Sequence, residues 1–113
     1  MAALSTVDVS VASPVNDLDG DLVSAAAGGD TAEVATSNMF LVVKNDDASS
    51  HTATIATPGA VKGLAIDDVA VTVADGDYAI VPLSLIFRGS TGRASISYDA
   101  VTSVSVGVFR MVI

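Results

Sequence analysis

The sequence predicts an all-β fold, a compact antiparallel β-sandwich or jelly-roll-like barrel with an irregular N-terminal arm. From Met39 onward, short runs of β-branched residues alternate with turn signals, and no segment shows the 3.6-residue apolar period of an amphipathic helix. Half of the residues are hydrophobic, yet the chain has only three Phe, two Tyr and no Trp. We therefore expect a core of Val, Ile, Leu and Ala packed between pleated layers.

The length of 113 residues fits one domain that buries a single core. We divide it into an N-terminal arm with a first strand, residues 1–38, and a sandwich body, residues 39–113. In the arm, Val7, Val9 and Val11 alternate like a strand. The Ala25–Ala27 run can begin a helix, which Gly28-Gly29 would limit to about one turn.

The body contains several predicted strands. Residues 39–44 are apolar on both faces, which favours a central position in a sheet. Residues 68–73 alternate, so that Val69, Val71 and Val73 should face the core. The Asp75-Gly76 pair is typical of a tight hairpin, so we expect residues 78–81 to return antiparallel beside residues 69–73.

Three further strands are expected, at residues 51–57, 94–98 and 104–111, with a loop through Lys62-Gly63. Pro82–Phe87 should form either an edge strand or a packed loop that carries Phe87 inward, because proline cannot donate to a central ladder.

The net charge of the chain makes some classes of partner unfavourable. Thirteen acidic residues against five Lys and Arg give a net charge of -8, which disfavours nucleic acid and anionic membranes as partners. The chain has no cysteine, which excludes disulfides and thiolate chemistry. No secretory signal and no membrane-spanning helix is expected from the apolar runs.

Asp17, Asp19 and Asp21, with Gly20 between them, have the alternate spacing of carboxylates in calcium loops. An EF-hand would continue with a glycine and then a bidentate glutamate where this chain has Leu22 and Gly28. The sequence favours a solvated turn over a calcium site here.

Other polar candidates also have simple structural interpretations. His51 follows Ser49 and Ser50, but a triad needs an orienting third group, so we expect an exposed or locally bonded histidine. Arg88 and Arg93 flank a Gly-Ser-Thr-Gly turn and should be solvated or contact a neighbouring acidic surface. We therefore predict no catalytic, cofactor-binding or metal-binding residue, and a protein that is not an enzyme.

Six segments, in order along the chain, span most of residues 24–110: Ala25–Thr31, Asn38–Asn45, Thr52–Gly59, Gly63–Ala65, Val69–Gly76 and Ser95–Val104. Together they resemble small virion proteins encoded near the capsid genes of tailed bacteriophages, the head decoration or cement proteins. Pro82–Arg88 departs from the Pro-Phe-rich segment expected in that family.

The resemblance implies a structural protein on the outer capsid surface of the virion, made in the host cytoplasm. Its partners would be the major capsid protein and further copies of itself, with a trimer favoured, and the family has no catalytic residues to transfer. The alternative is an immunoglobulin-like or carbohydrate-binding module on a phage tail or fibre, although few rings are available for stacking on sugars.

Overall fold

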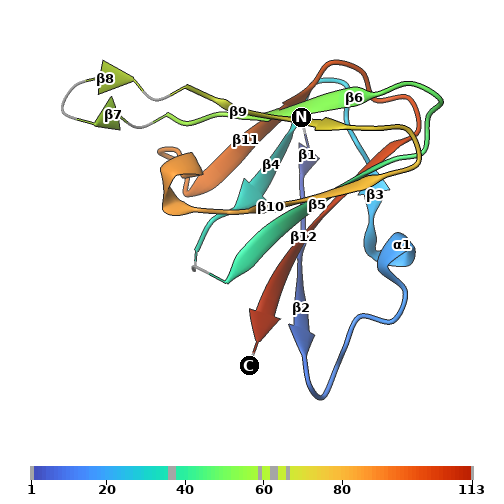
Figure 1. Cartoon of the computed structure of the whole chain (residues 1–113). Coiled ribbons are helices and arrows are strands. Elements are labelled where there is room, and N and C mark those ends of the chain that lie inside the picture. Colours follow the sequence, from blue (N-terminus) through green and yellow to red (C-terminus); the bar gives the residue numbers. More distant parts are fainter. Residues whose placement is uncertain (1, 36–37, 59, 62–63, 66, 113) are drawn as a thin grey trace.

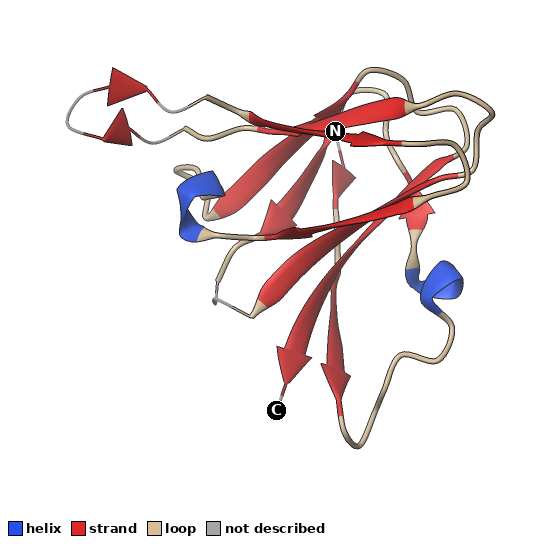
Figure 2. Ribbon diagram, viewed as in Figure 1, coloured by secondary structure: helices blue, strands red, loops and turns tan. Residues whose placement is uncertain are grey.

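A computed structural model describes residues 2–35, 38–58, 60–61, 64–65 and 67–112. Its described part is mostly strand, arranged as two facing sheets, which confirms the predicted all-β sandwich (Figures 1 and 2). The first sheet has the order β1 (Ala2–Ala3), β4 (Asp30–Glu33), β11 (Arg93–Tyr98), β6 (His51–Ile55), β9 (Val69–Val73). The second has the order β10 (Tyr78–Pro82), β5 (Met39–Asn45), β12 (Val104–Val112), β2 (Thr6–Ser10), with β3 (Val23–Ser24) also paired to β12.

The remaining elements are short and lie outside the two main ladders. The strands β7 (Ala60–Val61) and β8 (Leu64–Ala65) form a small hairpin that projects from the body beyond β6 and β9 (Figure 1). A four-residue helix, α1 (Leu18–Asp21), precedes β3, and a 3₁₀ turn, η1 (Leu85–Phe87), follows β10. The expected loop at Lys62-Gly63 lies outside the described residues.

The core lies between the two sheets and uses the period-two faces that the sequence predicts. Val104, Val106 and Val108 of β12 are all buried in it, as is Val73 of β9. The expected central position of residues 39–44 is confirmed, because β5 is hydrogen-bonded to β10 on one side and to β12 on the other. The buried core side chains of β5, β6 and β11 are Met39, Leu41, Val43, Ala53, Ile55, Ala94 and Ile96.

A second apolar layer covers the outer face of the β5–β12 pair. Phe40 and Phe109 stack there with their ring centroids 5.6 Å apart, and Phe109 is 1% exposed. Leu22 lies directly over Gly107, where an added Cβ would be 2.7 Å from its Cδ2 atom. The chain that links α1 to β3 can therefore close on the sheet only because position 107 has no side chain.

Part of the expected N-terminal arm belongs to the two sheets, while residues 11–17 form an irregular and largely exposed segment. β1 pairs parallel with β4, β2 pairs parallel with β12, and Leu4 between them is buried in the core. Arg93 of β11 fixes this segment, since its guanidinium donates to the carbonyl oxygens of Leu4 and Thr31 at 3.0 and 3.1 Å. Both pairings join strands that are far apart in the sequence, and β2 and β12 come from opposite ends of the chain, so no local sequence pattern indicates them.

The helix expected at Ala25–Ala27 does not form. The Ala25 N–H donates instead to the Val104 carbonyl at 2.9 Å, which extends the β3–β12 pairing. The short helix forms earlier, at Leu18–Asp21, where Asp17 caps it by accepting from the Gly20 N–H.

The hairpin predicted between residues 69–73 and 78–81 is wrong. β9 pairs with β6 in the first sheet and β10 pairs with β5 in the second, so the Asp75-Gly76 turn crosses between sheets. Asn45, fully buried at the end of β5, holds this crossing. Its main chain bonds Gly76 and Asp77, while its amide nitrogen donates to the carbonyl oxygens of Val73 and Ser49 at 2.9 and 2.8 Å.

Both alternatives for the segment after β10 are partly realised. Pro82 ends β10, which is an edge strand of the second sheet, as expected for a residue without an N–H group. The following turn η1 carries Phe87 into the core, where it is 4% exposed.

We predict that Asn45→Ala lowers the free energy of unfolding by about 2–3 kcal/mol, because two carbonyl oxygens lose their side-chain donor inside the protein. Urea denaturation followed by circular dichroism measures this change. The matched control is Asn16→Ala at an exposed position, which should stay within about 0.5 kcal/mol of the unchanged protein. A loss equally small for Asn45→Ala would contradict the proposed role of the amide.

Candidate functional site

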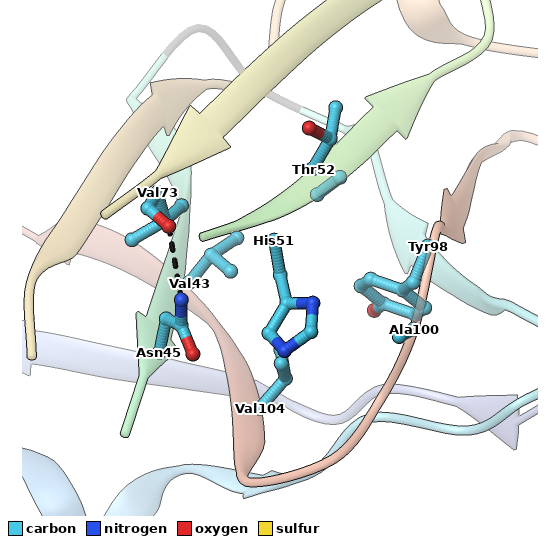
Figure 3. Close-up of a pocket in the computed structure, with 9 residues that line it drawn as sticks. Val43, Asn45, His51, Thr52, Val73, Tyr98, Ala100 and Val104 are labelled. Carbon is cyan, nitrogen blue, oxygen red and sulfur yellow. Dashed lines mark hydrogen bonds between the residues drawn. The ribbon is translucent and has the colours of Figure 1, made fainter. Parts of the chain in front are cut away.

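His51 lies where β6 begins, between two loops that end the facing sheets (Figure 3). Its Nε2 atom is 2.7 Å from Oδ2 of Asp47, in the β5–β6 loop. Its Nδ1 atom is 3.4 Å from Oδ1 of Asp99, which directly follows β11. The side chain is 12% exposed, so the imidazole joins the two loops rather than facing solvent.

The hollow around His51 is too small for a ligand. It is lined by Asn45, Val73 and Tyr98 among others, and it has no room even for a water molecule (Figure 3). Both ring nitrogens face carboxylates, so neither is placed to take a proton from Ser49 or Ser50. The histidine is locally bonded, one of the two alternatives that the sequence left open.

The two carboxylates around His51 are held in their charged forms. The hydrogen bond from His51 lowers the pKa of Asp47, and the Ala48 N–H adds to this effect. The pKa of Asp99 is lowered chiefly by the Thr52 N–H, which its Oδ1 accepts at 3.0 Å. His51, Asp47 and Asp99 come from three different loops or strand ends. Ionisation of the two aspartates therefore affects the contacts that hold this end of the sandwich together.

The three aspartates of the possible calcium loop have separate contacts. Asp17 caps α1, while Asp19 accepts a hydrogen bond from the Tyr78 hydroxyl at 2.7 Å and pairs with Lys44 at 3.1 Å. The Tyr78 bond and then Lys44 lower the pKa of Asp19. Asp21 lines a different feature, a cavity of about 190 Å³ beside β2 and β3. Within the described residues, no three Asp, Glu, His or Cys side chains gather as a metal site would require.

The two arginines that flank the glycine-bounded turn have different environments. Arg93 is half-buried and donates to Leu4 and Thr31, so its contacts are internal. Arg88 is exposed, and none of the ion pairs between described residues includes it. Of these two arginines, only Arg88 is therefore available to contact an acidic surface of another molecule.

A hydrogen-bonded pair that the sequence did not indicate joins the buried Asp30 to the half-buried Tyr98. The Tyr98 hydroxyl donates to Oδ2 of Asp30 at 2.7 Å, and the Ala26 N–H donates to the same oxygen at 3.2 Å. Desolvation, followed by the contact with Asp30, raises the pKa of Tyr98. Asp30 follows Gly28-Gly29 and resembles an ordinary turn residue in the sequence, so only the fold shows that it is fully buried.

Exposed apolar side chains gather at two places on the second sheet. The strand-tip patch lies where β2 and β12 end together and consists of the exposed Val11, Met111 and Val112, with the half-buried Val9 beside Met111. Val11 in this patch is 93% exposed. The edge patch follows β10 into η1 and consists of Tyr78, Ile80, Pro82, Leu85 and Ile86.

The edge patch is continuous because Ile80 and Pro82 share one face of β10, and Pro82 and Leu85 line the same groove of about 270 Å³. Apolar patches of this kind mark surfaces that contact other molecules. The strand-tip patch and the edge patch were not predicted from the sequence, because β-prone runs look alike whether a neighbouring strand covers them or not.

No family model, curated protein or solved structure matches the chain. No described helix is long and apolar enough to cross a bilayer.

The depressed pKa values of Asp47 and Asp99 predict a stability that depends on pH. Folded-state values below the ordinary value mean that the stabilisation is present above about pH 4 and is lost as the pH falls through the folded-state values. We expect Asp99→Asn to reduce the slope of unfolding free energy against pH between about pH 2 and pH 5, measured by urea titration.

The matched control for this measurement is Asp67→Asn, which changes an exposed aspartate whose main chain is bonded to Thr57, beyond the end of β6 opposite His51. It should leave the slope closer to that of the unchanged protein. An equal effect of both variants would show that general charge repulsion, rather than the His51 contacts, sets the acid sensitivity.

Proposed function

We propose that this chain is a structural virion protein that binds the outer surface of a phage capsid and stabilises the head lattice, a decoration or cement protein. The proposal starts from the resemblance of six segments to proteins encoded near capsid genes. It assigns no catalytic residue, and its partners are the major capsid protein and further copies of the chain.

The observation that carries the proposal is the strand-tip patch on a strongly acidic protein. A net charge of -8 favours solvation, yet Val11 is 93% exposed, and Met111 and Val112 beside it are 40% and 42% exposed. Covering such side chains stabilises a contact by roughly 25 cal/mol for each Å² removed from water. The patch offers a small apolar contact suited to a surface that presents the same position many times.

Repetition makes a modest contact sufficient. Copies that bind neighbouring positions and also contact one another raise each other's local concentration, so their combined hold exceeds that of one contact. The hollow beside β2 and β3 and the groove at Pro82 and Leu85, of about 190 and 270 Å³, are smaller than usual small-molecule sites, which suits a role carried by outer surfaces.

The alternative, a carbohydrate-binding module, requires exposed rings on which sugars stack. Phe87 and Phe109 are buried, and Phe40 stacks on Phe109. Tyr78 is 47% exposed, but its hydroxyl is bonded to Asp19 and Lys44 lies 5.4 Å from its ring centre. The arrangement of the rings favours a protein surface as partner over a glycan.

We expect the purified protein to sediment with capsid shells of the phage that encodes it, and to add density to their outer surface in cryo-electron microscopy. Val11→Ser should weaken this binding roughly tenfold, because the patch loses its most exposed apolar side chain. Titration of shells with labelled protein measures the affinity.

The matched control is Val23→Ser, which makes the same change at a 53% exposed valine near the opposite end of β12. It should bind like the unchanged protein, and thermal melting of both variants should show intact folds. Shells that bind no folded protein on their outer surface would refute the proposed function.

A further inference from the structure

The outer edge of β10 differs from the other edges of the two sheets. The edge strand β9 exposes the small side chains of Ala70 and Thr72, and β1 has only two residues. The edge strand β2 carries Asp8, paired with Arg110 at 2.8 Å. Charges, proline and shortness are among the usual protections of sheet edges. β10 has five residues and no charged side chain, its proline is only its last residue, and Ile80 at its centre is 67% exposed.

The backbone of β10 is free to pair on its outer side. Asp77 and Leu83 are bonded to β5 through their main chains, so every second residue from 77 to 83 points its N–H and C=O groups inward. The intervening Tyr78, Ile80 and Pro82 therefore direct theirs outward. Pro82 supplies only a carbonyl oxygen, which an incoming strand must meet with a donor.

Two copies of this edge satisfy each other when they run antiparallel. With Ile80 opposite its counterpart, the two Ile80 residues exchange both backbone bonds, and each Tyr78 N–H reaches the Pro82 carbonyl of the other copy. The missing donor of Pro82 leaves only the Tyr78 carbonyl to solvent. The register is fixed by the two-fold axis, because such an interface uses the same surface on both copies.

The charges around β10 favour the same arrangement. Residues 78–87 contain no charged side chain. Two copies of an acidic protein can therefore bring these segments together without placing like charges side by side. Asp75 and Asp77 lie before the strand, and Arg88 lies after it without an ion pair among the described residues. Antiparallel pairing brings the acidic end of each copy to the Arg88 end of the other.

We propose that the chain forms a two-fold symmetric dimer through antiparallel pairing of β10, which joins the second sheets of two copies. The dimer brings the edge patches of two copies side by side, with the two Ile80 side chains as cross-strand neighbours, and leaves the strand-tip patch free, because β2 is at the opposite edge of the sheet. This inference does not rest on the proposed function, and a two-fold pair differs from the trimer that the resemblance favours.

The first test uses the absence of cysteine from the natural sequence. In Ile80→Cys, the two introduced thiols should face each other with Cα atoms about 5.5 Å apart, within disulfide range. The control is Val11→Cys, which is more exposed and so more open to chance collisions. We expect Ile80→Cys to form a disulfide-linked dimer at least tenfold faster on mild oxidation, and equal rates would overturn the proposal.

The second test measures mass and charge pairing in the unmodified chain. Sedimentation of the full chain at about 100 μM, above the micromolar Kd of a weak interface, should give twice the mass of 11.3 kDa. Asp77→Lys and Arg88→Glu should each weaken the dimer roughly threefold, and the double variant should restore it.

A monomer at that concentration, or a dimer indifferent to Ile80→Lys, would overturn the proposal. A monomer whose Ile80→Lys variant loses capsid binding would also overturn it, and would assign the β10 edge to the shell instead. Because dimer formation is measured without capsids, failure of the dimer and failure of the proposed function give separate results.

Discussion

The buried amide of Asn45 is the contact on which the arrangement of the two sheets depends. β9 and β10 are consecutive strands that belong to different sheets, so the turn between them must leave one ladder and enter the other. At such a crossing, backbone groups lose their ladder partners and need others, because unpaired polar groups are costly when buried. Asn45 bonds the main chain on both sides of the turn, through Val73 before it and through Gly76 and Asp77 after it.

The same end of the sandwich is closed by a second set of polar contacts. His51 joins the loop after β5 to the loop after β11, and Asp99 also accepts the Thr52 N–H. Residues that in a sequence suggest chemistry, a histidine with nearby acids and serines, are used here to hold loops. The apolar interior packs the sheets together, while these polar groups determine which strands become neighbours.

Two apolar surfaces on the second sheet connect this architecture to the proposals. One lies at the tips of β2 and β12 and the other along β10, at opposite edges of a single four-stranded ladder. A rigid sheet that presents one contact at each edge can hold a neighbouring copy and a supporting surface at once. That geometry suits assembly on a lattice, where weak contacts act together.

The sequence by itself determined the positions of the longer strands from β5 to β12, the core-facing valines of β9 and β12, and the central position of β5, because side-chain alternation and two-faced apolarity are local properties. It did not indicate β4, which joins β1 to β11 in the first sheet. Nor did it indicate the parallel pairing of β1 with β4 and of β2 with β12, the crossing after Val73, or the burial of Asp30 beside Tyr98. Nor did it separate a bonded His51 from an exposed one. Those features follow from which distant strands meet, and only the tertiary structure decides that, since no local preference distinguishes one strand partner from another.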